Sequence, residues 1–249
     1  RPWTTSRPPR PSSPITYIGF SNGQAHYSID TTRANQPATS TLRYFARMVN
    51  WLHNGKPDVD HALASDFETG VYDTSTFGRI GDGPTGPYYT DQDTRSEGAR
   101  FWIPSMDELT KAAFYDPNKE GDGEGGWWQW GNSSDEQPIP GDPALGGQTN
   151  AGAQVPSNTQ WPEGHFRPLD VGSYPDERSP WGLLDSAGGG REWTESWRED
   201  SEEFEQHNRL VLPSGAFRLI ERGYLGDIEG TRPVGGYPTL RLAMAVPAP

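Results

Sequence analysis

The stretch LLDSAGGGREWTESW, residues 183–197, holds three consecutive glycines between Asp185 and the pair Glu192–Trp193. Bulky side chains lie on both sides, so side chains are missing only over this short turn. Glycine is selected where the backbone must take a positive φ angle or pass very close to another group. We therefore expect the turn to lie tightly against another strand, an ion or a ligand.

The composition of the chain limits what can surround this turn. Of 249 residues, 30 are glycine and 24 are proline, which predicts a loop-rich fold with few long helices. Only 32% are hydrophobic, but 10 Trp, 10 Tyr and 9 Phe can build a core of aromatic rings. The formal charge of -13 argues against nucleic acid as a partner, because phosphate contacts need a basic surface.

Several kinds of chemistry have no sequence support. Cysteine is absent, which excludes disulfides, thiolate metal sites and cysteine nucleophiles. The five histidines are scattered without metal-ligand spacing, and neither a Gly-x-Ser-x-Gly elbow nor a phosphate-binding glycine loop is present. The acidic run 198–205 could supply paired carboxylates, although such runs are more often solvated loops. We predict no catalytic residue, with an enzyme of unrecognised active site as the minor alternative. No run of about 18 apolar residues exists, so no membrane span is expected.

The chain is expected to form one domain behind a short arm. Residues 1–14, RPWTTSRPPRPSSP, are predicted to be extended and polyproline-like, either a linker or an arm that docks on a neighbour. ITYIGF (15–20) and AHYSID (25–30) are typical of short strands, with a turn at Asn22–Gly23. Without an internal repeat, residues 15–249 are predicted to be a single domain.

Two main helices are predicted. Residues 40–53 carry apolar side chains at helical spacing. The second helix lies in PSMDELTKAAF, residues 104–114, which opens with a capping box and is stopped by Asp116–Pro117. Between the helices, residues 56–98 are expected to be irregular, with at most a short hairpin near 70–77.

Four segments resemble, in the same order, segments of the formylglycine-generating enzyme (sulfatase-modifying factor) family. They are RFWIPSMDELTKAAFYD (100–116), WWQWGN (127–132), DVGSYPDERSPWGLLDSAGGGREWTESW (170–197) and LRLA (240–243). RYFARMVNWLHNGKPD (43–58) is similar to a helix of secreted bacterial members. The resemblance covers about residues 35–245. It implies an α+β, C-type lectin-like fold with a small twisted antiparallel sheet, two main helices and extensive ordered loops.

This resemblance also implies a calcium ion inside the glycine turn. The ligands would be oxygen atoms of Asp185, Gly188, Gly190 and Glu192. Carboxylates mixed with backbone carbonyls are a normal ligand set for calcium. The alternative is a plain glycine turn in which Glu192 pairs with an arginine such as Arg191 or Arg198.

A second calcium site of the family maps less cleanly onto the chain. Its ligands would be oxygen atoms of Asn150, Ala151, Glu163 and His165. Asn150 and Ala151 fit only with a shift of one residue, which weighs against an ion there.

The activity that names the family is not expected. The oxidase binds copper through a pair of cysteines, which this chain lacks, and family members that use iron carry an extra helical domain. RLVLPSGAFRLIERGY (209–224) departs strongly from the family pattern beside the active-site groove. The resemblance therefore implies neither copper nor iron, and nothing in the sequence indicates a nucleotide.

Two classes of function remain. The first is a non-catalytic, calcium-stabilised subunit of an extracellular or cell-surface assembly. Family domains begin with further strands that have no counterpart here, which would leave an open sheet edge beside LRLA (240–243). A partner subunit, or the arm of a neighbouring copy, could complete that edge, because unpaired edges accept strands. The alternative is that residues 15–30 of the same chain pair with this edge in an abbreviated fold. The final residues AMAVPAP (243–249) are similar to segments that precede the surface anchor in exported bacterial proteins, which favours that location.

The second class is a ligand-binding module for a glycan or a peptide. Trp127 and Trp128 lie close to Asn132 and could form an aromatic platform in the loops. Tryptophan also fills the core of loop-rich folds, which is the expectation for Trp130.

Overall fold

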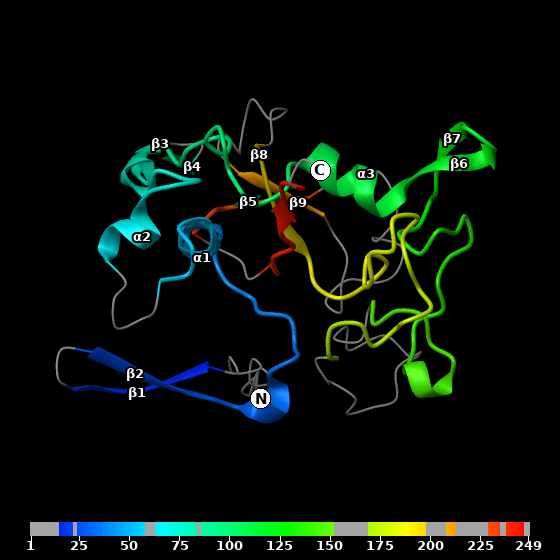
Figure 1. Cartoon of the computed structure of the whole chain (residues 1–249), viewed down its shortest axis with the longest axis horizontal. Coiled ribbons are helices and arrows are strands. Elements are labelled where there is room, and N and C mark those ends of the chain that lie inside the picture. The colour runs from blue at the N-terminus through cyan, green and yellow to red at the C-terminus, as the bar shows by residue number, and fades with distance from the viewer. Residues whose placement is uncertain are drawn as a thin grey trace, which may run out of the picture.

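The computed structural model describes residues 15–21, 24–57, 63–83, 86–151, 169–197, 208–212, 229–234 and 238–246. Over these ranges the chain is an α+β protein with few helices and small antiparallel sheets (Figure 1). The helices are α1 (Leu42–His53), α2 (Ala64–Glu68) and α3 (Met106–Phe114). None of the helices in the described part is long and apolar enough to cross a membrane.

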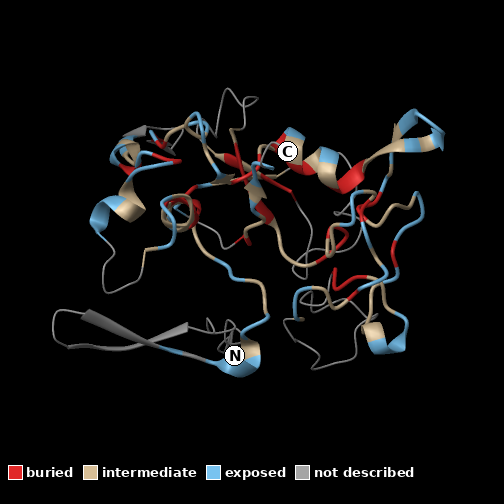
Figure 2. Cartoon of the chain, viewed as in Figure 1, coloured by how far each residue is buried: buried red, intermediate tan, exposed pale blue. Residues whose placement is uncertain are grey.

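A three-stranded sheet lies between the two main helices. Its strands are β8 (Glu192–Trp197), β9 (Arg209–Leu212) and β10 (Glu229–Thr231), in the order β10-β9-β8. Side chains alternate between the faces of a strand. Accordingly, Val211 packs with α1 while Leu212 packs with α3, so the helices cover opposite faces of β9. Figure 2 shows buried positions on α1, α3, β8 and β9.

The buried side chains form two main clusters, one on each face of the sheet. The cluster on the α1 side contains Leu42, Phe45, Ala46, Val49, Val71, Tyr72, Ile103, Trp193 and Val211. The cluster on the α3 side contains Met106, Leu109, Ala113, Phe114 and Leu212. Aromatic rings supply much of this interior, as the composition predicts.

Helix α1 confirms the first predicted helix. The Thr41 side chain accepts a hydrogen bond from the Tyr44 N–H at 3.3 Å, so Thr41 is the N-cap and the helix starts at Leu42 rather than at residue 40. The helix ends at Asn54, after which Gly55 takes a positive φ angle of 90°.

Helix α3 confirms the second predicted helix and its capping box, formed by Ser105 and Glu108. The structure adds a strand that the sequence reasoning missed. Strand β6 (Tyr115–Gly121) follows α3 directly and pairs with β7 (Glu124–Trp127). Asp116–Pro117 therefore lies inside a strand, which is tolerated because both strands of a two-stranded hairpin are edges.

The hairpin expected near residues 70–77 is wrong. The Asp73 side chain accepts the Ser75 N–H at 2.9 Å, and this local bond starts a 3-10 turn at Thr74–Thr76. The hairpin of this region lies later, between β3 (Arg79–Gly83) and β4 (Gly86–Tyr89).

Asn50 of α1 holds the loop in front of this hairpin. Its side-chain nitrogen donates to the carbonyls of Phe67 and Tyr72, at 2.9 and 2.7 Å. Its side-chain oxygen accepts the Tyr72 N–H at 2.8 Å. Buried backbone groups need hydrogen-bond partners. The buried side chain of Asn50 supplies them here, in place of a neighbouring strand.

The N-terminal strands are confirmed as β1 (Ile15–Ser21) and β2 (Gln24–Ile29). They form an antiparallel hairpin from Ile15–Ile29 to Ser21–Gln24. Over the described ranges β1 and β2 pair only with each other, and Figure 1 shows the hairpin apart from α1 and the three-stranded sheet.

The C-terminal segment returns to the body of the protein. Strand β11 (Ala243–Met244) pairs with β5 (Phe101–Trp102). Thr239 bridges both Thr39, in front of α1, and Glu192, at the start of β8. Part of the LRLA segment thus enters a strand, and its partner is β5.

Candidate functional site

The glycine turn lies against another segment of the same chain. A Cβ atom on Gly188 would lie 2.5 Å from Thr149 Oγ1 and 2.9 Å from Asn150 Oδ1, so only glycine fits. The Thr149 hydroxyl donates to the Ala187 carbonyl at 2.6 Å, and Asn150 Oδ1 accepts the Gly189 N–H at 2.6 Å. Residues 149–150 thus lie inside the curve of the turn.

The two carboxylates predicted to bind calcium have different partners in the structure. Glu192 is buried and pairs with Arg241, with 2.7 Å between Oε1 and Nη2. Arg241 Nη2 also donates to the Leu184 carbonyl at 3.0 Å. Asp185 has a positive φ angle of 62°, and its Oδ2 accepts the Gly172 N–H at 2.7 Å. Burial acts to lower the pKa of Arg241, but Glu192 and then Asp185 raise it above its ordinary value.

These residues fit a calcium ion poorly. Calcium takes six to eight oxygen ligands, and an ion at Glu192 would lie beside the positive charge of Arg241. The expected alternative, a Glu192–arginine pair, is present with a partner that the sequence reasoning missed. Arg191 pairs with Glu229 instead, and Arg198 lies outside the described residues. Calcium binding at this turn stays a prediction.

That prediction has a direct test. An ion that binds only the folded chain raises its Tm. If calcium binds at this turn, it raises the Tm of the wild type above its value in chelator, and Glu192→Gln removes this difference. Scanning calorimetry measures both, and equal Tm values for the wild type in calcium and chelator would contradict calcium binding.

Two of the four residues of the second predicted calcium site, Asn150 and Ala151, lie within the described residues. The Asn150 side chain belongs to the glycine turn, where it bonds both the N–H and the carbonyl of Gly189. Ala151 is buried and packs with Trp130. Glu163 and His165 lie outside the described residues. Within the described ranges, no group of three or more His, Asp and Glu side chains could hold a metal ion.

The three predicted ligand-binding residues point to different partners. Trp127, at the end of β7, is 47% exposed. Trp128 is partly buried, and its Nε1 donates to Asp116 Oδ2 at 3.1 Å. Asn132 Nδ2 donates to Glu177 Oε2 at 2.7 Å. Trp127 is therefore the member of this set that faces solvent, while Trp130 is buried as expected.

Tyr115 lies beside Trp127, and Trp181 bonds the backbone of Tyr115; the sequence reasoning missed both residues. The rings of Tyr115 and Trp127 are 5.1 Å apart and inclined by 59°. Trp181 is 54% exposed, and its Nε1 donates to the Tyr115 carbonyl at 2.7 Å. We call Tyr115, Trp127 and Trp181 the aromatic platform. The β6–β7 register places Tyr115 opposite Trp127, and this pairing could not be predicted because strand β6 was itself missed.

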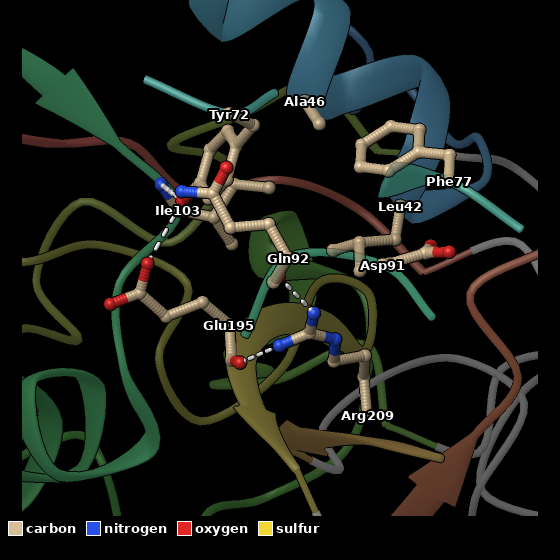
Figure 3. A pocket seen from close by; sticks show the side chains of 9 residues that line it. All are labelled: Leu42, Ala46, Tyr72, Phe77, Asp91, Gln92, Ile103, Glu195 and Arg209. Carbon is tan, nitrogen blue, oxygen red and sulfur yellow. Dashed lines mark hydrogen bonds between the residues drawn. The ribbon is translucent and has the colours of Figure 1, made fainter. Parts of the chain in front are cut away.

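A buried ionic cluster lies at the centre of the molecule, beside a cavity of about 10 Å³ (Figure 3). The cavity is lined by Leu42, Ala46, Tyr72, Phe77, Asp91, Gln92, Ile103, Glu195 and Arg209. This volume admits about one water molecule and leaves no room for a substrate.

Arg209 is the buried cation of this cluster. It donates to the backbone carbonyls of Gln92, Asp93 and Glu195, and burial lowers its pKa to about 10. Its Nε has no hydrogen-bond partner among the described residues. Arg209 thus links β9 to β8 and to the loop at 92–93, and these bonds hold the three segments together.

Glu195 is the buried anion. Its Oε2 accepts the Tyr72 hydroxyl at 3.0 Å, and its Oε1 pairs with Arg95 Nη1 at 2.7 Å. Arg95 also pairs with Glu108, the capping residue of α3, at 2.7 Å. The cluster therefore connects β8, α3 and the loop held by α1, through the pairs of Arg95 with Glu195 and Glu108.

Glu195 should make stability depend on pH. Burial raises the pKa of its carboxyl above the ordinary 4.5, although Tyr72 and Arg95 act to lower it. The raised pKa means that Glu195 contributes stability below 4.5 that is lost as pH rises through the folded-state pKa. The stability of the wild type relative to Glu195→Gln is therefore expected to fall over that range. Urea unfolding at a series of pH values measures it, and a constant difference would contradict the raised pKa.

Comparison with known proteins gives little guidance. No protein-family model matches the chain, and no curated protein matches it. The solved structure of Treponema denticola variable protein 1 is similar, with a TM-score of 0.48 and 14% sequence identity over 94% of this chain and 77% of that chain. A likeness this distant carries no argument about family or function.

Proposed function

We propose that the chain is a non-catalytic subunit of an extracellular or cell-surface assembly. The observation that carries the proposal is the β1–β2 hairpin, which over the described ranges pairs only with itself. We further propose that the α+β fold is of the C-type lectin-like, formylglycine-generating enzyme type. The order of the matched segments supports this, together with α1, α3 and the closing contact of Thr239 beside β8.

An isolated two-stranded hairpin is only marginally stable in water. Each of its strands has one edge whose backbone groups pair with no other strand in the described part of the chain. Such edges accept a strand from another chain, which adds backbone hydrogen bonds and buries side chains. A neighbouring subunit that supplies this strand would make the hairpin part of a larger sheet.

Sedimentation velocity of the purified chain over a wide concentration range tests the proposal. Thr16→Pro removes a backbone donor inside β1 and should prevent strand pairing. The wild type is expected to form larger species as concentration rises, and Thr16→Pro to stay monomeric with an unchanged Tm. A wild type that remains monomeric at every concentration, in calcium and in chelator, would contradict an assembly subunit.

A second candidate function is a module that binds a glycan or a peptide. The exposure of Trp127 and of Trp181, each of which contacts Tyr115, favours it, because exposed apolar patches mark interaction sites. Titration of a soluble glucan oligosaccharide, followed by tryptophan fluorescence, should then give saturable binding that Trp127→Ala abolishes. Fluorescence that does not change on titration would count against this candidate for that glycan.

A further inference from the structure

We propose that the aromatic platform binds the proline- and arginine-rich arm, residues 1–14, of a second copy of this chain. The inference rests on the proposed function, because it names the surface that receives the arm in the assembly. It requires an arm of the right chemistry, a rigid acceptor surface, and a placement of the two in the fold that favours contact between two molecules.

The arm has the sequence of a polyproline ligand. Pro8 and Pro11 form one Pro-x-x-Pro pattern, Pro11 and Pro14 form a second, and Arg7 and Arg10 lie within or beside them. Closely spaced prolines favour the extended polyproline II helix before binding, so little conformational entropy is lost when it docks. Segments of this kind are recognised by surfaces of exposed aromatic rings.

The platform supplies such rings in a fixed arrangement. Tyr115 is held in place because Trp181 Nε1 donates to its carbonyl and its ring lies directly over Gly125, where a Cβ atom would collide with it. Its ring faces Trp127 at 5.1 Å with an inclination of 59°. Surfaces that are rigid before binding lose less entropy than surfaces that must become ordered.

The β6–β7 hairpin carries exposed negative charge that complements the positive charge of the arm. The exposed side chains of Glu120, Asp122 and Glu124 lie on β6–β7. Lys119, on the same hairpin, is already paired with Asp135 at 2.8 Å. One positive charge also lies beside the platform, because Lys111 Nζ is 5.7 Å from the centroid of the Tyr115 ring.

The arm, by contrast, contains three arginines and no acidic residue. Complementary charges of this kind speed association and favour the correct partner, and arginine also stacks on tryptophan.

The position of the two hairpins favours a second copy as the partner. The arm precedes Ile15, the first residue of β1, and Figure 1 shows the β1–β2 hairpin at the lower left, its open end towards the middle of the molecule, and β6–β7 at the upper right. An arm that binds the platform of a neighbour makes a head-to-tail contact. Repeated contacts of this type build a ring or a filament.

The test combines a labelled peptide of residues 1–14 with the full-length chain. Fluorescence anisotropy is expected to show binding that weakens at least about tenfold in Trp127→Ala, as for an aromatic anchor residue. Tyr44→Ala is the matched control, because Tyr44 is 56% exposed on α1, and it should bind as the wild type does. A peptide with Pro8→Ala and Pro11→Ala should bind more weakly, and excess wild-type peptide should dissociate the assembly in sedimentation.

The outcomes separate this inference from the proposed function. A chain that assembles, but whose assembly ignores both the peptide and Trp127→Ala, would overturn the inference and leave the assembly intact. A monomeric chain that binds the peptide through Trp127 would overturn the assembly and place the arm on its own molecule. Binding of a glucan oligosaccharide at Trp127 without binding of the peptide would identify a glycan as the occupant and overturn the inference.

Discussion

Arg241→Met is expected to lower the free energy of unfolding by about 3–5 kcal/mol, because it leaves a buried charge without its partner. Glu192 loses the guanidinium 2.7 Å from its carboxylate, and the Leu184 carbonyl loses a donor at 3.0 Å. Urea unfolding followed by tryptophan fluorescence measures the loss.

Two controls isolate this effect. Arg47→Met breaks a pair with Glu68 that lies at the surface, so the loss there should be about 0–1 kcal/mol. The double variant Arg241→Met, Glu192→Leu should recover much of the stability that the single variant loses, because a buried ion pair can be replaced by apolar side chains. Equal losses of unfolding free energy for Arg241→Met and Arg47→Met would show that Arg241 does not stabilise the buried carboxylate of Glu192.

Trp193→Ala is expected to cost about 3–5 kcal/mol, the range for removing a fully buried aromatic side chain. Trp193 is 0% exposed and packs in the cluster on the α1 side of the sheet. Its Nε1 also donates to the Ser40 carbonyl at 2.9 Å, which would lose that donor. The measurement is the same urea unfolding experiment.

Trp127→Ala is the matched control for Trp193→Ala. Both positions are tryptophans in strands, but Trp127 is exposed on β7, so its replacement should change stability by about 0.5 kcal/mol or less. A small loss at both positions would mean that the aromatic core contributes much less than its burial indicates.

The elements that the sequence predicts well are those set by neighbours in the chain. Thr41 begins α1 and Ser105 begins α3 through bonds to residues three positions away. The strands of the β1–β2 hairpin were predicted from their alternation and from Asn22–Gly23 between them. The β3–β4 hairpin was missed because glycine and proline interrupt its alternation.

Contacts between distant segments could not be predicted in the same way. Glu192 and Arg241 are 49 positions apart, and neither local periodicity nor spacing links them. The buried pair of Glu195 with Arg95 crosses 100 positions. Trp127 ends β7 and Trp128 follows it outside the strand, so only the fold decides which of the two is exposed.

The amide of Asn50 makes the loop at 67–72 part of the cooperative unit of α1. Because its three hydrogen bonds start from a helix residue, the loop cannot detach while they remain intact. The loop in turn carries Tyr72, whose hydroxyl bonds Glu195 on β8. The end of α2 and the irregular residues that follow it therefore transmit the position of α1 to the central sheet.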